Sequence, residues 1–195
     1  MSRSVYVASP EGLTGKSAVA LGLLDALIRE VGSVGVFRPL TTLGGSGPDE
    51  EVDHIVEMLV AQPGTDQTYE EALGVTYAQA HVDPDEALHL IVERYGRLAS
   101  RFRVMVVLGS DYTDVSTGTE LSFNARVAAN LGSPVVLVVH GGDAHLHRGL
   151  RRVHRVGLGE GDGQVLPHAG RQARDRLGHL VAAGEDDARE RREGA

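Results

Sequence analysis

A stretch near the N-terminus limits the folds that this 195-residue chain can adopt, because a short predicted strand there is followed, after one turn, by a predicted helix. Residues 4–8 are mostly β-branched, aromatic or small, which predicts a buried strand. Residues 16–31 carry apolar side chains at helical spacing and predict a helix. The turn between them ends in Gly15-Lys16-Ser17. Strand, glycine-containing turn and helix in this order are typical of a phosphate-binding P-loop.

The residue types in this turn suit phosphate chemistry. Backbone N–H groups at the start of a helix carry partial positive charge and point toward a bound anion. Glycines let the backbone close around phosphate oxygens, a lysine adds a point charge, and a serine hydroxyl can hold Mg²⁺. We therefore predict a phosphate- or nucleotide-binding set of Gly12, Thr14, Gly15, Lys16 and Ser17. The candidate ligand is Mg-ATP, with the hydroxyl of Ser17 on the metal.

The match to the standard P-loop is incomplete. The usual spacing places a glycine at position 10, which is Pro10, and a variant one residue longer places it at position 9, which is Ser9. One alternative is therefore an ordinary helix start that has lost phosphate binding. Against it, Lys16 is the only lysine beside 18 arginines, which indicates a role that arginine fills poorly.

Alternating strands and helices continue through the first 140 residues. Further strands are predicted at 34–37, 104–108 and 134–139, and further helices at 49–62, from Asp83 to about residue 102, and at about 121–131. Residues 63–82 give no clear assignment. The pattern predicts an α/β fold of the P-loop NTPase type, an open, mostly parallel sheet with helices on both faces. Ligands of such sheets bind outside the carboxyl ends of the strands.

Two further side chains are candidates for that edge of the sheet. Asp111 follows the strand 104–108, where it would lie near Mg²⁺, or it is a polar turn residue. Arg38 follows the second strand and would meet an anionic ligand, or it has a plain surface role. Glu120 and Asn124 are interpreted as capping residues at the start of a helix.

Composition excludes several classes of function. The chain has no cysteine, so disulfides, thiol chemistry and Cys-zinc sites are excluded. A net charge of −8 argues against nonspecific nucleic-acid binding, and no apolar run is long enough for a membrane helix or a signal peptide. We expect a cytoplasmic protein. The histidines His140, His145, His147 and His154 match no standard metal-site spacing.

The composition changes near residue 140. Residues 1–140 carry 18 acidic and 9 basic side chains, whereas residues 141–195 carry 9 acidic and 10 basic side chains and are rich in glycine and histidine. We predict a P-loop-like α/β domain at 1–142 and a poorly ordered or atypical Gly/Arg/His-rich tail at 143–195. Out-of-frame translation of a GC-rich gene would explain the tail, and a natural disordered extension is the alternative.

Several motifs together resemble one protein family. They are Val5–Ser9, the Gly15–Ser17 helix start, Val36–Leu40, Val107–Tyr112 and Glu120–Arg126. In this order they resemble the N-terminal domain of long-form bacterial phosphate acetyltransferase, which is similar in fold to the P-loop enzyme dethiobiotin synthetase. The resemblance covers roughly residues 3–142.

This resemblance implies a function and a limit to it. The family interconverts acetyl-CoA and phosphate with acetyl phosphate and CoA, but a separate C-terminal domain carries the transfer. We expect that domain to lie outside this chain, so no catalytic residue is assigned and the chain's own enzymatic activity stays open. The resemblance implies a regulatory or assembly role, with a nucleotide or metabolite as ligand. It also implies homo-oligomers or association with catalytic acetyltransferase domains.

Two other functions remain open. Dethiobiotin synthetase-like domains continue into a further helix and a strand ending in an Ala-Asn turn that recognises the base, and we find no such segment. We therefore expect the sheet to be incomplete at its C-terminal side. A stand-alone ATP-dependent enzyme of the dethiobiotin synthetase type is one alternative function. A non-catalytic interaction module is the other.

Overall fold

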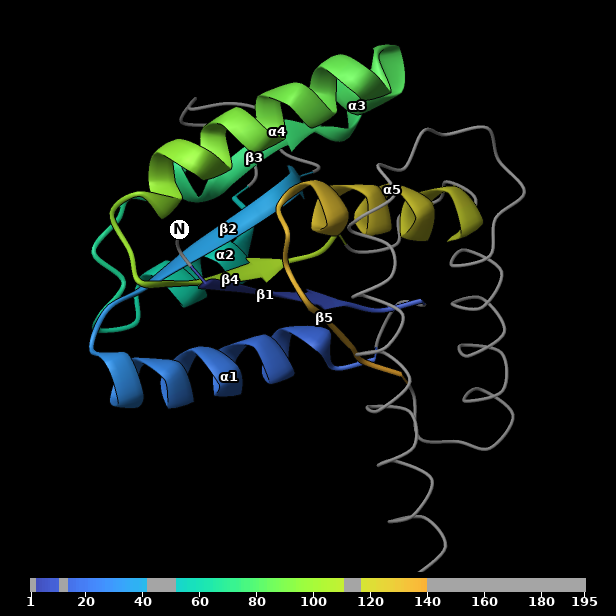
Figure 1. Cartoon of the computed structure of the whole chain (residues 1–195). Coiled ribbons are helices and arrows are strands. Elements are labelled where there is room, and N and C mark those ends of the chain that lie inside the picture. Colours follow the sequence, from blue (N-terminus) through green and yellow to red (C-terminus); the bar gives the residue numbers. More distant parts are fainter. Residues whose placement is uncertain (1–2, 11–13, 42–51, 111–116, 140–195) are drawn as a thin grey trace, which may run out of the picture. The chain divides into compact units, whose positions relative to one another are not determined.

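The computed structural model describes residues 3–10, 14–41, 52–110 and 117–139, with the backbone alone at 117–120. Five strands form one parallel sheet in the order β3-β2-β4-β1-β5 (Figure 1). The strands are β1 (Arg3–Ala8), β2 (Val34–Thr41), β3 (Leu73–Thr76), β4 (Val104–Leu108) and β5 (Val135–Leu137). The predicted α/β class with an open parallel sheet is therefore confirmed.

Helices cover both faces of this sheet. They are α1 (Lys16–Val31), α2 (His54–Val60), α3 (Tyr77–Val82), α4 (Pro84–Ala99) and α5 (Thr117–Asn130), with a short 3-10 helix η1 (Glu70–Ala72). Figure 1 shows α1 on one side of the sheet and α4 and α5 on the other. Neighbouring residues of one strand therefore enter different cores. Tyr6 of β1 packs with the α4 cluster, and Val7 packs with the α1 cluster.

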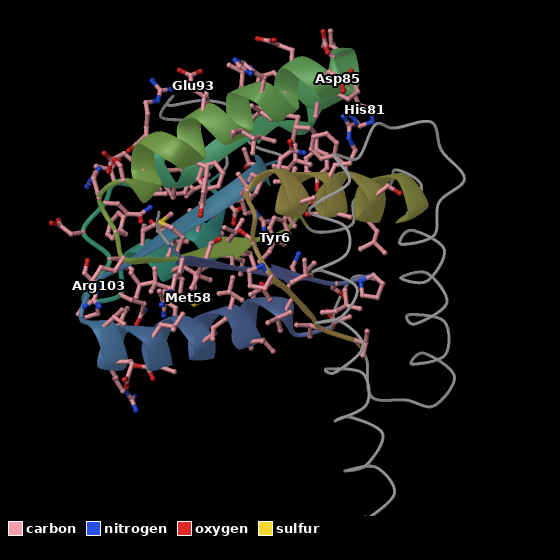
Figure 2. The ribbon with its side chains drawn as sticks, in the orientation of Figure 1. Tyr6, Met58, His81, Asp85, Glu93 and Arg103 are labelled. Carbon is pink, nitrogen blue, oxygen red and sulfur yellow. The ribbon has the colours of Figure 1, made fainter. Side chains whose placement is uncertain are left out.

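Burial on both faces explains the apolar strands. Every residue of β4 from Met105 to Leu108 is buried, as expected for a parallel strand with helices on both sides. Figure 2 shows Tyr6 in the interior, while Asp85 and Glu93 lie on the outer side of α4. Among the residues that the structure describes, no helix is long and apolar enough to cross a membrane.

The path of the chain creates a topological switch point at one edge of the sheet. After β1 the chain crosses by α1 to β2, on the far side of β4. After β4 it crosses by α5 on the other face and reaches β5, on the far side of β1. The connections leaving β1 and β4 thus run to opposite faces. Ligands of open α/β sheets bind at such a switch point, outside the carboxyl ends of the two strands.

The second strand is longer than predicted. The strand predicted at 34–37 continues through Arg38-Pro39 to Thr41. Its second half pairs with β3, a strand within residues 63–82, for which the sequence gives no clear assignment. Gly74 allows this pairing because a Cβ there would lie 2.2 Å from the carbonyl oxygen of Pro39. Only glycine lets the edge strand pass so close to the proline.

Other boundaries also differ from the predictions, among them the end of α4, which lies at Ala99 where about residue 102 was expected. The helix expected at 49–62 begins at His54 and ends at Val60, with Asp53 as its N-cap; residues 49–51 lie outside the described part. The last helix begins at Thr117, earlier than the predicted residue 121, and the last strand spans 135–137 where 134–139 was expected. The predicted tail at 143–195 and the four histidines from His140 to His154 lie outside the described residues.

Candidate functional site

The turn after β1 enters α1 through a glycine in the left-handed conformation. Gly15 is the N-cap of α1, with φ 80° and ψ 16° in the left-handed region. Residues with a Cβ rarely adopt this conformation, so the glycine permits the abrupt entry into the helix. Thr14 Oγ1 donates a hydrogen bond to Ser9 Oγ over 3.0 Å, which ties the two ends of the turn together. Ser17 lies in the first turn of α1 and is partly exposed.

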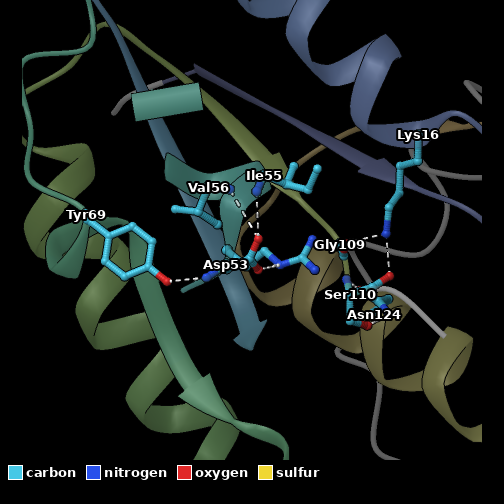
Figure 3. A network of polar contacts seen from close by, with 9 residues as sticks. Lys16, Asp53, Ile55, Val56, Tyr69, Gly109, Ser110 and Asn124 are labelled. Atoms are coloured by element: carbon cyan, nitrogen blue, oxygen red, sulfur yellow. Dashed lines mark hydrogen bonds and ion pairs between the residues drawn. The ribbon is translucent and has the colours of Figure 1, made fainter. Parts of the chain in front are cut away.

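Lys16 points from the start of α1 to the end of β4. Its side chain is 4% exposed, and Nζ donates hydrogen bonds to the carbonyl oxygen of Gly109 over 2.6 Å and to that of Ser110 (Figure 3). Carbonyl oxygens compensate a buried ammonium group, which would otherwise be costly to desolvate. The lysine predicted from the sequence is thus held at the switch point between β1 and β4.

Arg38 reaches the same carbonyl from β2. Nη1 donates to the oxygen of Gly109 over 3.1 Å, and Nε lies 2.9 Å from Oδ2 of Asp53. The arginine is 5% exposed, so the surface role given as one alternative is wrong, and the guanidinium reaches the carboxyl end of β4. Two cations therefore lie within 3.1 Å of one carbonyl oxygen.

Asp53 joins this cationic pair to α2. Its Oδ1 accepts hydrogen bonds from the backbone N–H groups of Ile55 and Val56 at 3.1 and 3.2 Å, which caps the helix. Its own N–H donates to the hydroxyl of Tyr69 over 2.8 Å. Asp53 is not among the site residues predicted from the sequence, because the helix was expected to begin at residue 49. An aspartate immediately before an apolar helical run was the available signal.

Asn124 is not a capping residue, contrary to prediction. It lies within α5, is 5% exposed, and its Oδ1 accepts hydrogen bonds from the hydroxyl of Tyr6 (2.5 Å) and the backbone N–H of Ser110 (3.1 Å). Its Nδ2 donates to Ser110 Oγ over 2.6 Å. The side chain therefore fixes the segment whose carbonyls hold Lys16.

Two of the predicted site residues, Gly12 and Asp111, lie outside the described residues. So does the side chain of Glu120. The structure brings Lys16 and Arg38 together, and it places Gly15 and Ser17 at the same helix start.

Comparison with known proteins gives the family. A family model described as an AAA domain matches residues 3–153. The chain belongs to the AAA domain family. It is also 31% identical over 150 residues to a phosphate acetyltransferase of Nitratidesulfovibrio vulgaris, an alignment covering 72% of this chain and 20% of that protein. A phosphate acetyltransferase of Synechocystis sp. is 28% identical over 144 residues, covering 71% and 20%.

The expected resemblance to phosphate acetyltransferases is therefore confirmed. The chain spans about a fifth of the length of these relatives. The match to an AAA domain accords with the P-loop-like start of α1 that the sequence predicts.

Oxygen donors, the kind of ligand that Mg²⁺ prefers, are carried by two side chains near the starts of α1 and α2. Mg²⁺ usually keeps several waters and takes only one or two protein ligands beside substrate phosphates. Ser17 offers a hydroxyl, and Asp53 offers a carboxylate whose oxygens already contact Arg38 and the start of α2. Among the described residues no group of three or more histidine, aspartate or glutamate side chains forms a metal cluster. Of the predicted magnesium pair Ser17 and Asp111, Ser17 lies in the described part and can supply one hydroxyl ligand, whereas both oxygens of Asp53 are already engaged.

Proposed function

We propose that the chain is a nucleotide-sensing regulatory or assembly module of a phosphate acetyltransferase, with the phosphates bound at the start of α1. The observation that carries the proposal is the position of Lys16. Lys16 directly follows the left-handed Gly15 in the sequence, and its ammonium group lies at the carboxyl end of β4. A cation at a helix start and a sheet switch point is suited to binding an anion.

The charges of the site support a phosphate ligand. Lys16 and Arg38 meet at the carbonyl of Gly109, and Asp53 is the carboxylate paired with that arginine. A phosphate chain would take Lys16 as a point charge and Arg38 as a planar donor. Mg²⁺ bound at Ser17 would supply charge neutralisation of the phosphate oxygens.

The role in acetyl phosphate metabolism rests on the relatives. Both are phosphate acetyltransferases, and this chain matches a fifth of each. The interconversion of acetyl-CoA and phosphate with acetyl phosphate and CoA would belong to a catalytic domain with which this module associates. β5 ends the sheet within the described residues, and a sheet edge is a ready surface for assembly.

Calorimetric titration tests nucleotide binding directly. We expect Mg-ATP to release or absorb heat on binding to the wild-type chain, and Lys16→Ala to weaken that binding by at least about tenfold, because a charge-assisted hydrogen bond is lost. Arg29→Ala is the matched control, because Arg29 is a cation in the last turn of the same helix whose side chain is 78% exposed.

The outcomes separate the candidate functions. Binding lost in Lys16→Ala and kept in Arg29→Ala supports a phosphate site at the helix start, and subsequent turnover of ATP would point to the stand-alone enzyme. A folded wild-type chain that gives no heat with Mg-ATP contradicts both nucleotide functions. The interaction module would then be the remaining function, and its oligomer size without nucleotide would be measured next.

A further inference from the structure

We propose that Asn124 and Tyr6 are positioning residues that hold the carbonyl clamp of Lys16, and that the strength of this clamp sets how readily the lysine is released to a ligand. The carbonyl clamp is defined here as the backbone oxygens of Gly109 and Ser110. The consequence for nucleotide rests on the proposed function. The clamp itself rests on the hydrogen bonds of Lys16 and Asn124 to the segment after β4.

The peptide unit between Gly109 and Ser110 connects Asn124 to Lys16. The carbonyl of Gly109 and the N–H of Ser110 belong to the same planar trans peptide, so they point in opposite directions and rotate together. The N–H donates to Asn124 Oδ1 over 3.1 Å, and the carbonyl accepts from Lys16 Nζ over 2.6 Å. By holding one end of the unit, Asn124 fixes the direction of the other.

Asn124 is itself held in place by hydrogen bonds to Tyr6 and Ser110. Its Oδ1 accepts a second hydrogen bond, from the hydroxyl of Tyr6 on β1 at 2.5 Å. Its Nδ2 donates to the side chain of Ser110 over 2.6 Å, so the amide cannot flip without losing its partners. Tyr6 and Ser110 are 0% and 2% exposed. These buried hydrogen bonds link β1, α5 and the end of β4, and buried networks of this kind act as a unit.

The two carbonyls and a phosphate ligand would compete for the ammonium group of Lys16. Lys16 is 4% exposed and already donates to two carbonyls. A phosphate must replace these bonds before it can use the ammonium group. The affinity for a ligand is reduced by the fraction of protein that is not yet competent to bind. A looser clamp is therefore expected to make Lys16 more reactive and the site tighter for phosphate.

The single lysine makes the clamp measurable without any ligand. Lys16 is the only side-chain amine of the chain, so its rate of reductive methylation by formaldehyde and cyanoborohydride reports its release. Trypsin cleavage after Arg3 separates the modified N-terminus from Lys16. Mass spectrometry of the Lys16 peptide then follows the one residue.

Tyr6→Phe is the main variant because it removes one hydroxyl and keeps the buried ring. We expect it to raise the methylation rate of Lys16 about fivefold, since one buried hydrogen bond of the network is lost. We expect its affinity for Mg-ATP to rise by a similar factor. Asn124→Ala removes the hydrogen bonds to the peptide and to Ser110, so a larger rise is expected where that variant folds.

Tyr95→Phe is the matched control. Tyr95 is a buried tyrosine of the same core cluster and makes an edge contact with Phe37, with ring centroids 5.6 Å apart. Denaturant unfolding of both variants shows how much methylation arises from the unfolded chain. The proposal is overturned if Tyr6→Phe methylates Lys16 no faster than Tyr95→Phe does, or if the increase follows global stability in both.

The two proposals can fail separately. Faster methylation of Lys16 in Tyr6→Phe, without any Mg-ATP binding, supports the clamp and contradicts the nucleotide function. Mg-ATP binding that depends on Lys16, with an unchanged methylation rate in Tyr6→Phe, keeps the nucleotide function and contradicts the clamp.

Discussion

At the scale of single residues, Gly109 is the most restricted position of the site. A Cβ on this residue would lie 2.8 Å from Asn124 Oδ1, 2.9 Å from Tyr6 Cε1 and 3.0 Å from the carbonyl oxygen of Val7. These atoms belong to a side-chain amide, an aromatic ring and a backbone, all of them buried. The close approach therefore leaves no room for any side chain at the residue whose carbonyl accepts from both cations.

Gly109→Ala is accordingly expected to destabilise the protein by about 1–3 kcal/mol, the usual range for overpacking a tight site. The variant should also displace the carbonyl from Lys16, so its methylation rate is expected to rise. Chemical denaturation gives the free energy of unfolding, and mass spectrometry of the methylated peptide gives the methylation rate of Lys16.

Gly96→Ala is the control for this prediction. Gly96 lies within α4, and a Cβ there would have no atom within 4 Å. Alanine is favoured over glycine inside a helix by about 0.5–1 kcal/mol, so this variant is expected to stabilise the protein. A destabilisation of equal size in both variants would contradict the close packing of Gly109.

At the scale of elements, two aspartates cap helices in very different surroundings. Asp53 caps α2 and also pairs with the buried Arg38. Asp83 caps α4 through bonds to the N–H groups of Asp85 and Glu86, in an exposed position. Both remove unsatisfied donors from a helix start, but only Asp53 also balances a buried charge.

We predict that Asp53→Ala costs about 3–5 kcal/mol of unfolding free energy, because it leaves a buried guanidinium without its carboxylate. Asp83→Ala should cost about 1 kcal/mol, the usual value for the loss of an N-cap. Denaturant titration of both variants measures the difference. Equal costs would show that the ion pair of Arg38 contributes little to the fold.

The elements with a clear local pattern could be predicted from the sequence, whereas β3 could not. β1, β4 and α1 have apolar runs or helical periodicity of their own. β3 has only four residues, one of them Gly74, and it is recognisable only once the strand passing Pro39 is in place. Proline cannot donate to a ladder, which made residues 38–39 resemble a strand end.

The site was predictable to the same extent. Gly15, Lys16 and Ser17 are adjacent in sequence, so a local pattern is enough to predict them together as a candidate phosphate site. The partners of these residues are distant along the chain. Arg38 and Gly109 are 71 residues apart, and Tyr6 and Asn124 are 118 apart. Such contacts depend on the strand order, which no local pattern contains, so Asn124 resembled a helix cap.

At the scale of the whole molecule, the described part of the chain holds two buried clusters and the site around Lys16. The two buried clusters draw their fully buried residues from Tyr6 to Ala128, and the residues around Lys16 come from 6 to 124. β5 (Val135–Leu137) is the last described strand and pairs with β1. The change of composition near residue 140 is the basis for the domain boundary predicted at 142.

We therefore predict that a chain ending at residue 142 unfolds cooperatively, with a midpoint close to that of the full chain, and that Lys16 in it is methylated at the same slow rate. A chain ending at residue 131 is the control, because it lacks β5 and exposes the edge of β1, whose Tyr6 N–H bonds to Pro134 at 2.8 Å. An uncovered strand edge favours aggregation and weakens the packing beside it, so the control should be less stable than the chain ending at 142. Equal loss of cooperativity in both shortened chains would show that residues 143–195 contribute to the core, and the boundary predicted at 142 would then be wrong.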